Sequence, residues 1–353
     1  MLTVAQIGVG YWGPNLLRNL VANKNCRVKT AVDLSSERRE YVNRLYPAIQ
    51  VTDDANEVFE DPEIKGVVIA TPVETHFELS VRAVQAGKHV LVEKPLATSV
   101  AEVDQIGNIA SRKNLVVMVG HTFLYNAAVR YVKQLIDSGE IGEIRYIYSQ
   151  RLNLGRIRSD VDALWNLAPH DISIIQYWLD DPDPISVVKR GVDYIQENIA
   201  DVVFMNILYP KKIMANIHVS WLDPQRARSM TIVGSKKMVV YDDTAENKIA
   251  IYDKGIDRKA VLGEHMDYDR TEFRKFDHRS GDVLLPKIDS KEPLEVEIEH
   301  FIDCTQNGTK CLTGVDHAKK VVQILSANDM ERIRGAQESR IQVRSRIPRA
   351  SAL

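Results

Sequence analysis

Residues 2–14 of the chain read LTVAQIGVGYWGP, and this stretch decides the fold. An apolar run ends at Ile7, and Gly8, Gly10 and Gly13 follow it as a GxGxxG pattern. Pro14 stands where a first helical turn tolerates a missing N–H. A glycine turn between a strand and a helix is typical of sites that hold a dinucleotide pyrophosphate at the helix N-terminus.

The residues around this stretch predict a parallel sheet. Nearly all-apolar runs alternate with segments of helical periodicity, and a capping box begins at Ser99. Such runs are typical of strands covered on both faces. We therefore expect a doubly wound α/β domain over residues 1–121, with strands at Leu2–Ile7, Arg27–Val32, Gly66–Thr71, His89–Glu93 and Leu115–Gly120.

The second part of the chain, residues 122–353, predicts an α+β domain with a large, mostly antiparallel sheet. Its strand-like runs follow one another through short polar turns, without helices between them. The charged segment 253–292 lacks periodicity and is expected to be a long excursion or a partly mobile loop. The expected helices are 128–138, Pro169–Leu179, 296–307 and 316–334. The expected strands are 144–153, 185–194, 201–208, 213–221, 230–233, 238–241 and 249–252.

Composition excludes several classes of protein. The chain has 353 residues, 46 Lys and Arg against 48 Asp and Glu, and a net charge of −2, so it lacks the basic excess of a nucleic-acid binder. No apolar run reaches the roughly 18–20 residues that cross a bilayer. The three cysteines, Cys26, Cys304 and Cys311, show no metal-ligand spacing. We expect reduced thiols, no metal, no membrane partner and a cytoplasmic location.

The end of the second predicted strand carries Asp33, twenty residues after Gly13. A carboxylate there accepts hydrogen bonds from an adenosine ribose and repels a 2′-phosphate, which favours NAD over NADP. Arg38 follows five residues later, and its positive charge means that NADP is not excluded as the cofactor. The turn residues Tyr11 and Trp12, together with Leu34, belong to the same predicted cofactor site.

Two further motifs end strands of the predicted parallel sheet. Ala70-Thr71-Pro72, with His76 behind it, closes one strand, and Glu93-Lys94-Pro95 closes another. Ligands of a doubly wound sheet bind at these carboxyl ends. Thr71, Pro72, His76, Glu93 and Lys94 are therefore candidate cofactor contacts. The alternatives are a proline that ends a strand, a histidine on a helix face and an exposed strand-end lysine.

A third constellation lies in the second domain, where residues 165–171 read WNLAPHD. Asn166 and His170 are four apart, a spacing that places both on one face at the start of a helix. An imidazole there is a candidate general base near neutral pH, and a purely structural histidine is the alternative.

The order of these motifs resembles the Gfo/Idh/MocA oxidoreductase family across essentially the whole chain. The resemblance implies a Rossmann domain, a second domain with an open-faced sheet that builds homodimers or homotetramers, and a nicotinamide cofactor. By matching motifs, Lys94 is the Glu-Lys-Pro lysine and His170 is the catalytic acid/base.

Departures from the family pattern bear on the substrate. Asn166 replaces the Asp of many polyol-oxidising relatives, and the Asn-x-x-x-His variant is similar to dehydrogenases of UDP-N-acetylhexosaminuronic acids. Residues 160–164 read DVDAL, without the glycine-rich run common before that variant. Lys94, Asn166 and His170 are expected to contact substrate. Three arginines precede this segment and could bind a substrate carboxylate or pyrophosphate: Arg151, Arg156 and Arg158. The alternative is that they belong to a solvated basic loop. Candidate substrate-wall residues are Tyr125 and Asn126.

These observations favour an NAD-dependent oxidoreductase that takes a hydride from a secondary alcohol of a sugar, in particular a nucleotide sugar. Two alternatives stay open: a free-sugar or inositol dehydrogenase, and a dinucleotide-sensing regulator without turnover. The sequence leaves open which sugar and carbon react, in which direction, and whether bound cofactor is recycled.

Overall fold

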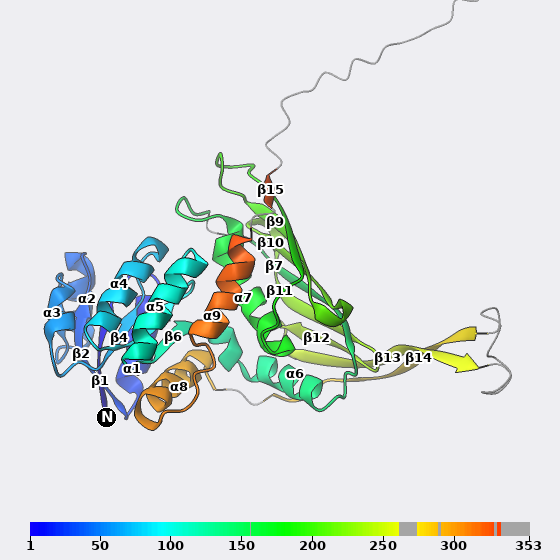
Figure 1. The fold of residues 1–353 in the computed structure, drawn as a ribbon, viewed down its shortest axis with the longest axis horizontal. Helices are drawn as coiled ribbons and strands as arrows, with labels where there is room; N and C mark the ends of the chain where they lie inside the picture. The colour runs from blue at the N-terminus through cyan, green and yellow to red at the C-terminus, as the bar shows by residue number, and fades with distance from the viewer. Residues whose placement is uncertain (156, 261–273, 289–290, 328–329, 333–353) are drawn as a thin grey trace, which may run out of the picture.

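The computed structural model of the chain describes residues 1–155, 157–260, 274–288, 291–327 and 330–332. Figure 1 shows a smaller sheet with its helices at the N-terminal end of the molecule and a larger sheet at the other end. Helices α7 (Ala163–Leu179) and α9 (Val315–Ser326) lie between them and pack on each other.

The first sheet has six strands in the order β3-β2-β1-β4-β5-β6, and every neighbouring pair is parallel. The order reverses between β1 and β4, and ligands of doubly wound sheets bind at such a point. β3 was not predicted, because three residues with two polar side chains show no pattern. The strands are β1 (Leu2–Ile7), β2 (Cys26–Val32), β3 (Gln50–Thr52), β4 (Gly66–Ile69), β5 (His89–Glu93) and β6 (Val117–Gly120).

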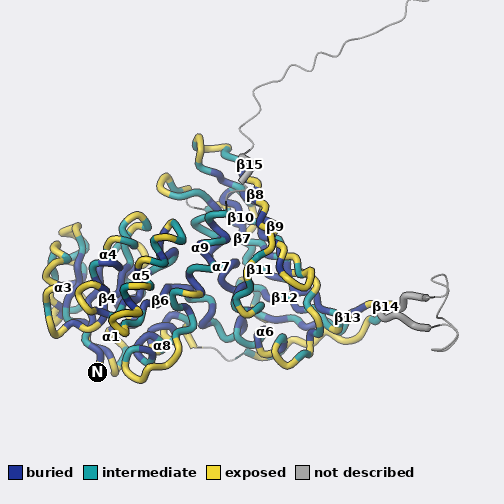
Figure 2. The backbone as a smooth tube through the Cα atoms, in the orientation of Figure 1, coloured by how far each residue is buried: buried dark blue, intermediate teal, exposed yellow. Residues whose placement is uncertain are grey.

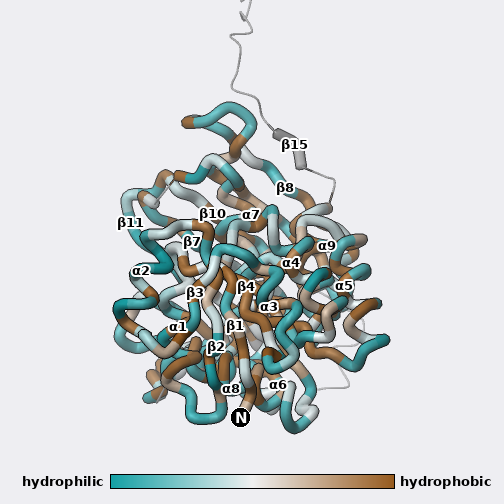
Figure 3. Tube along the Cα trace, turned by 90° about the vertical axis from the view of Figure 1, so that its left-hand side faces the viewer, coloured by the Kyte–Doolittle hydropathy of each residue, from teal (hydrophilic) through white to brown (hydrophobic). Residues whose placement is uncertain are grey.

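Helices cover both faces of this sheet, as its apolar strands require. One buried cluster joins the strands to α1 (Gly13–Ala22), α2 (Ser36–Leu45) and α8 (Pro293–Asn307). A second cluster joins them to α3 (Asn56–Glu60), α4 (Val73–Gln85), α5 (Val100–Arg112) and α9. Figure 2 shows the strands in the colour of buried residues, and Figure 3 shows hydrophobic residues along β1 and β4. The doubly wound prediction is confirmed.

The C-terminal helices return to the first sheet after the chain has built the second. Glu292, just before α8, pairs with Arg18 of α1 at 2.6 Å, and Lys319 of α9 pairs with Asp104 of α5 at 2.7 Å. A cut at residue 121 would therefore remove two covering helices from the first sheet. The division into residues 1–121 and 122–353 stays a prediction.

The second sheet has nine described strands in the order β14-β13-β12-β11-β7-β10-β9-β8-β15. All neighbours are antiparallel except β7 with β10 and β8 with β15. The strands are β7 (Ile144–Leu154), β8 (Ser186–Val192), β9 (Val202–Leu208), β10 (Met214–Ser220), β11 (Leu222–Gly234), β12 (Met238–Asp242), β13 (Ile249–Ala260), β14 (Arg274–Leu284) and β15 (Met330–Arg332). Two 3₁₀ turns are η1 (Thr122–Tyr125) and η2 (Pro210–Lys212).

Only one face of the second sheet is covered by helices within the described residues. α6 (Ala127–Asp137) contacts β12, and α7 contacts β7, β9 and β10. Burial alternates along β8 and β9, as expected for a half-covered sheet. The opposite face exposes large apolar side chains: Tyr146, Val188, Phe204 and Met214. The predicted large, mostly antiparallel open-faced sheet is confirmed.

Two segments of the second half differ from what the sequence predicted. The segment 253–292 is the long excursion that was expected, but its described residues include paired strands instead of only a loop: β13 and β14 form an antiparallel ribbon that projects from the sheet (Figure 1). The sequence of this segment has no apolar period, which is the pattern that predicts a strand. The last helix ends at Ser326 instead of residue 334, and β15 follows it as a parallel partner of β8.

Candidate active site

The glycine turn between β1 and α1 is held by close backbone approaches. Gly8 has φ +93°, and a Cβ on it would lie 2.5 Å from the Ala70 carbonyl oxygen. A Cβ on Gly13 would lie 2.4 Å from the carbonyl oxygen of Gly8. Buried Gln6 donates from Nε2 to the carbonyl oxygens of Gly8 and Gly13, at 2.9 and 2.8 Å. Only glycine fits at positions 8 and 13.

Gly10 differs, because a Cβ there would meet no atom within 4 Å. The protein itself therefore does not require glycine at this position, whereas a ligand lying against the backbone would. Helix α1 begins after Trp12 without a side-chain cap, so no side chain occupies its first N–H groups. Open space over Gly10 beside an uncapped helix N-terminus fits a dinucleotide pyrophosphate.

Asp33 ties the second strand to the glycine turn. Its Oδ2 accepts from the Val9 N–H at 2.7 Å, and its Oδ1 accepts from the Ser35 N–H at 2.9 Å. Each carboxylate oxygen keeps a lone pair for a ribose hydroxyl. Tyr11 and Leu34 are exposed beside it, at 86% and 87% of their accessible surface.

The basic residue that holds the loop after β2 is Arg39, the neighbour of the predicted cofactor residue Arg38. The Arg39 guanidinium donates to the carbonyl oxygens of Asp33 and Leu34, at 2.7 and 3.0 Å. Arg38 contributes its backbone N–H to the Ser35 cap of α2, at 3.4 Å. Cofactor contact by Arg38 stays a prediction.

His76 links two strand ends of the first sheet. The side chain is buried, with Nδ1 2.8 Å from the Pro95 carbonyl oxygen and Nε2 2.9 Å from that of Thr71. Burial is the main cause that lowers the pKa of this imidazole. Because both nitrogens face carbonyl oxygens, His76 positions the loops after β4 and β5. Cofactor contacts by Thr71 and Pro72 stay predictions.

Glu93 and Lys94 lie half-buried at the end of β5, where the Lys94 backbone N–H donates to Glu93 Oε2 at 3.3 Å. Burial raises the pKa of Glu93 to about 7, while the charge of Lys94 and a side-chain hydrogen bond from Trp12 oppose this rise. Burial lowers the pKa of Lys94 to about 8, against the effect of Glu93. Arg151 and Arg158 lower it further. A lysine whose pKa is lowered in this way is a candidate proton-handling or oxyanion-stabilising group.

Helix α7 begins earlier than the sequence predicted. Asp162 caps it by accepting from the Trp165 N–H at 2.9 Å, and the helix runs from Ala163 through Pro169. Pro169 was taken as the helix start, because proline is common at a first turn. Asn166 and His170 therefore lie inside the helix, one turn apart on one face.

Lys94 reaches that face of α7 from the first sheet. Its Nζ donates to the Asn166 carbonyl oxygen at 2.8 Å, although the two residues are 72 positions apart. His170, one turn further, is half-buried, and its Nδ1 is buried without a hydrogen-bond partner among the described residues. Its ring packs edge-on against Phe123, with the ring centroids 5.0 Å apart.

Positive charge surrounds the His170 ring. Burial is the main cause that lowers its pKa well below the ordinary value, and Lys94, Arg151, His121 and Arg228 lower it further. The imidazole is therefore neutral near pH 7 and able to accept a proton. An anionic ligand beside it would offset the surrounding cations.

Two family models match the chain. The first, described as "Oxidoreductase family, NAD-binding Rossmann fold", matches residues 2–121, and the second, the "GFO/IDH/MocA C-terminal domain", matches residues 129–240. The chain belongs to the Gfo/Idh/MocA family. The predicted family, oxidoreductase class and NAD-binding Rossmann domain are thereby confirmed.

Relatives within the Gfo/Idh/MocA family differ in substrate. The chain is 30% identical over 194 residues to UDP-N-acetylglucosamine 3-dehydrogenase of Acidithiobacillus ferrooxidans, covering 55% of this chain and 60% of that protein. It is 30% identical over 132 residues to scyllo-inositol 2-dehydrogenase (NADP(+)) of Bacillus subtilis, covering 37% and 36%. The chain therefore spans less than two thirds of the length of these curated relatives.

Solved structures share the fold over nearly the whole chain. The A. ferrooxidans enzyme superimposes with a TM-score of 0.74 at 23% identity, covering 92% of this chain and 95% of that one. GenD2 from gentamicin A biosynthesis, solved in complex with NAD, gives a TM-score of 0.75 at 20% identity, covering 92% of each chain. At these identities the likeness shows the fold alone.

Some predicted substrate residues of this Gfo/Idh/MocA member lie elsewhere. Tyr125 is 2% exposed and its hydroxyl is 3.0 Å from Thr313 Oγ1, so it belongs to the core and does not line a substrate. Asn126 caps α6 by accepting from the Ala128 N–H at 2.9 Å. The Tyr125 assignment is a correction: the end of a strand was taken for a ligand wall, although the 3₁₀ turn η1 carries Tyr125 inward. Substrate contact by Asn126 stays a prediction.

The predicted basic residues have different surroundings. Arg151 is buried and makes two hydrogen bonds to Asp171, at 2.9 and 3.1 Å, below Phe123. Arg158 pairs with Asp160 through Nε at 2.8 Å. Arg156 lies outside the described residues. Arg151 therefore supports the Phe123 ring, which packs on His170, and substrate contact by Arg151 or Arg158 stays a prediction.

Several residues near the site were missed by the sequence analysis. Arg228 on β11 adds charge near His170, but it has no neighbouring motif. Buried His121 follows β6, with its ring centroid 5.4 Å from that of His317. His317 in turn contacts Ser173 Oγ at 2.8 Å and Asp181 Oδ1 at 2.7 Å. Long-range folding brings these residues together, so no local pattern predicts them.

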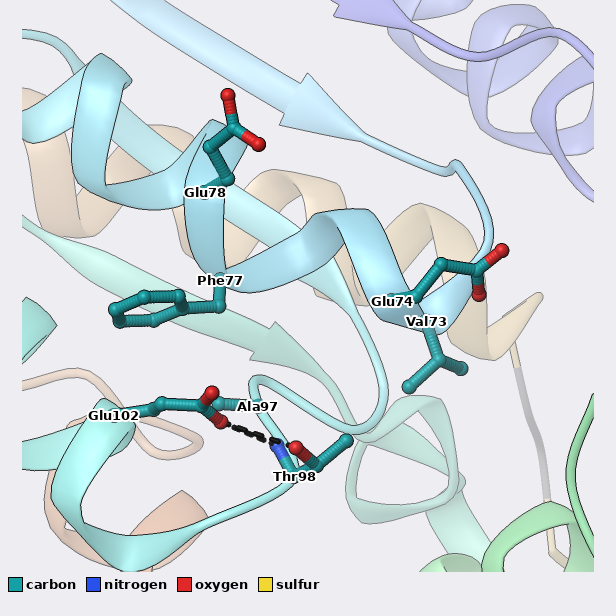
Figure 4. Close-up of a pocket in the computed structure, with 7 residues that line it drawn as sticks. All are labelled: Val73, Glu74, Phe77, Glu78, Ala97, Thr98 and Glu102. Carbon is teal, nitrogen blue, oxygen red and sulfur yellow. Dashed lines mark hydrogen bonds between the residues drawn. The ribbon is translucent and has the colours of Figure 1, made fainter.

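A hollow of about 310 Å³ lies apart from these groups, between α4 and the loop that leads into α5 (Figure 4). None of the predicted catalytic or substrate residues lines it. Thr98 and Glu102, which are hydrogen-bonded at 3.1 Å, form one wall. The lining residues are Val73, Glu74, Phe77, Glu78, Ala97, Thr98 and Glu102. It is therefore separate from the groups around Lys94 and His170.

Among the described residues, no helix is long and apolar enough to span a membrane.

Proposed function

We propose that this Gfo/Idh/MocA protein is an NAD-dependent dehydrogenase that oxidises a secondary alcohol of a sugar, with a nucleotide sugar as the preferred substrate class. The contact between Lys94 Nζ and the Asn166 carbonyl oxygen carries the proposal. It joins a titratable lysine of the first sheet to the helix that presents His170. A reacting carbon held between these groups would meet both a base and an oxyanion donor.

The residues of the first sheet would hold the cofactor. The pyrophosphate would lie over Gly10 at the start of α1, and the ribose would bond Asp33. NAD, when bound, supplies a nicotinamide that accepts a hydride. The residues of the chain then need only place the alcohol, accept its proton and stabilise the oxygen.

His170 would accept the hydroxyl proton. Its Nδ1 is buried, so Nε2 is the nitrogen that would face the substrate. Lys94 would donate a hydrogen bond to the oxygen as the carbonyl forms. Asn166 cannot take a proton, so its amide would orient the hydroxyl or the cofactor. Each group thus has one role: His170 takes the proton that the alcohol loses, Lys94 stabilises the oxygen, and Asn166 orients the ligand.

The charge around His170 supports an anionic substrate. Lys94, Arg151 and Arg228 all act on the imidazole. Arg151 is paired with Asp171, whereas Asp243 lies 3.5 Å from Arg228 and pairs with it only loosely. A pyrophosphate or uronic carboxylate would complement this surplus. The similarity to a UDP-N-acetylglucosamine 3-dehydrogenase favours the same class. The similarity to an inositol dehydrogenase supports the second candidate, a free polyol.

Replacing His170 with alanine tests the catalytic assignment. We expect His170→Ala to lose turnover by about 10²–10⁴-fold, because the general base is gone, while NAD binding measured by calorimetry is unchanged. His278→Ala is the matched control, since His278 is exposed on β14. Wild-type turnover in His170→Ala would refute the assignment of the base.

A substrate panel tests the substrate class. Thermal-shift measurements with NAD and UDP-sugars, free sugars or inositols should show the largest stabilisation by a UDP-sugar, because a cognate ligand stabilises by mass action. NADH formation with the same compounds separates an enzyme from a sensor. Turnover of an unactivated polyol without UDP-sugar binding would favour the second candidate, and binding without NADH formation would favour a regulator.

The exposed face of the second sheet supports a homo-oligomer as part of this proposal. Phe204 stacks on His218 with ring centroids 4.1 Å apart, and Val188 and Met214 are about half exposed near it. Large exposed apolar side chains gathered on one face of a sheet are typical of an interface. Light scattering should therefore give the mass of a dimer or tetramer.

A further inference from the structure

Two cysteines and a histidine that are separate in the sequence meet at the end of α8. His300 and Cys304 are one helical turn apart, and Cys311 follows in the loop before α9. The Cys304 sulfur is 3.4 Å from His300 Nε2, and the two sulfurs and the histidine nitrogen all lie within 4.8 Å of one another. The sequence analysis expected isolated reduced thiols.

Backbone N–H groups of the loop define the protonation of this cluster. The Leu312 N–H donates to His300 Nε2 at 3.0 Å, so that nitrogen carries a lone pair and can accept the Cys304 proton. The Thr313 backbone donates to the Cys311 sulfur, and the Cys311 thiol hydrogen-bonds Cys304. This Cys311 contact is the main cause that lowers the pKa of Cys304 to about 5.

A soft metal ion is the other ligand that such a donor set suggests. A closed structural zinc site needs four ligands. Only three ligands lie within reach among the described residues. A thiolate beside a second thiol is instead the arrangement of dithiols that exchange with disulfides.

We propose that Cys304 and Cys311 are a redox-active dithiol that closes to a reversible disulfide, with His300 as the base for Cys304. Cys304 is only 2% exposed and Cys311 is half-buried, so a large oxidant could not reach the two sulfurs. The oxidant would therefore be a small hydroperoxide. Cys26 belongs to a separate part of the molecule, on β2, and is not included.

The chemistry balances as a two-electron oxidation. The Cys304 proton passes to His300 Nε2, and the thiolate attacks one peroxide oxygen, which breaks the O–O bond, gives a sulfenic acid and releases water after protonation. The Cys311 sulfur then attacks Cys304 Sγ, expelling the sulfenic hydroxyl as a second water. Two thiols and one hydrogen peroxide thus give one disulfide and two waters.

Closure would tighten a loop that supports the first sheet. The Thr313 carbonyl accepts from the Val119 N–H of β6 at 2.9 Å, and the Thr313 hydroxyl meets Tyr125. A covalent link from α8 to Cys311 would hold this loop in place. The oxidised protein should therefore unfold at a higher temperature than the reduced one.

Mass spectrometry of the full chain after mild peroxide treatment tests the proposal. Trypsin cleaves after Lys310 and separates Cys304 from Cys311, so peptides 292–310 and 311–319 stay joined only through a disulfide. We expect this joined pair in the oxidised protein and its loss on adding a thiol reductant. Over-oxidation of Cys304 without a cross-link, or a protein purified with one zinc per chain that blocks the thiols, would overturn the proposal.

Variants assign the roles of the three residues. Cys311→Ser should stop at a sulfenic acid on Cys304 that dimedone traps, and Cys304→Ser should leave Cys311 unmodified. His300→Ala should slow cross-linking about tenfold, because less thiolate is present. Cys26→Ser is the matched control and should cross-link at the wild-type rate. Cross-linking of Cys26, or an equal rate in His300→Ala, would contradict the assignment; none of these readouts depends on dehydrogenase activity.

Discussion

The two ends of the proposed active site are built from different kinds of contact. At the dinucleotide end, Gly8, Gly13 and Asp33 lie within one strand–helix–strand unit, joined by contacts such as Val9 N–H to Asp33. At the substrate end, Lys94 meets Asn166 across 72 positions and between two sheets. The first end is a local structure that a short sequence specifies, whereas the second depends on how the whole chain packs.

Removing the amine of Lys94 tests the substrate end and should have the largest effect after the loss of the His170 imidazole. Lys94→Met is expected to lower turnover by about 10²–10³-fold, because the donor to the developing carbonyl oxygen is lost. NAD affinity should change little, since the pyrophosphate and ribose contacts lie on β1 and β2. Steady-state kinetics and calorimetry measure the two quantities.

Lys113→Met is the matched control for this prediction. Its Nζ donates to the Gln85 carbonyl oxygen at 2.8 Å on the surface, far along the chain from α7. This variant should turn over like the wild type. If Lys94→Met lost NAD affinity and kept its turnover, Lys94 would belong to the dinucleotide end and the comparison would fail.

Two glycines of one turn sharpen the comparison at the other end. Gly13→Ala would force a Cβ to 2.4 Å from the Gly8 carbonyl oxygen, so it should cost about 1–3 kcal/mol of stability and weaken NAD binding as well. Gly10→Ala adds a Cβ in open space, so the free energy of unfolding should be unchanged while the Kd for NAD rises about tenfold or more.

Denaturant unfolding and NAD titration of both variants separate fold from ligand. Equal losses of stability would mean that Gly10 serves the turn itself. Unchanged NAD binding in Gly10→Ala would mean that no ligand approaches the backbone there, against the assignment of this turn to the pyrophosphate.

The elements that the sequence predicted correctly are those that a local pattern specifies. Leu2–Ile7 and His89–Glu93 are the observed bounds of β1 and β5, because an apolar run between clear turns specifies a buried strand. Tyr125 was wrong because the same position past a strand can turn inward or outward. β3 is too short to show a period.

The substrate end shows where local reading stops. The motif was found at His170, but the start of α7 was misplaced by several residues because Pro169 stands inside the helix. Arg228 and His317 reach the surroundings of the site from β11 and α9, and no spacing in the sequence connects them to His170. Contacts between distant elements are set by tertiary packing.

The pH dependence of alcohol oxidation tests the charge state of the substrate end. Burial lowers the pKa of Lys94 to about 8, so the rate should fall about tenfold per pH unit above that value as the ammonium is lost. The pKa of His170 is lowered well below 6.5, so the base stays neutral from pH 6.5 to 8 and the acid-side loss appears only below that window. Lys94→Arg stays charged at high pH, so the fall in rate above pH 8, the basic limb of the pH profile, should disappear. A basic limb unchanged in Lys94→Arg would assign it to another group.

The smallest expected effect concerns cofactor choice at the dinucleotide end. Asp33→Ser removes a carboxylate that would repel a 2′-phosphate, while Arg39 remains beside the same loop and Arg38 follows it. The preference for NAD over NADP, measured as a ratio of kcat/KM, should fall about tenfold. Turnover with saturating NAD should stay near that of the wild type, because Lys94 and His170 are untouched. A variant that kept its cofactor preference but lost turnover would show that the two ends are coupled through the loop after β2, and the separation drawn between a local dinucleotide end and a long-range substrate end would then be wrong.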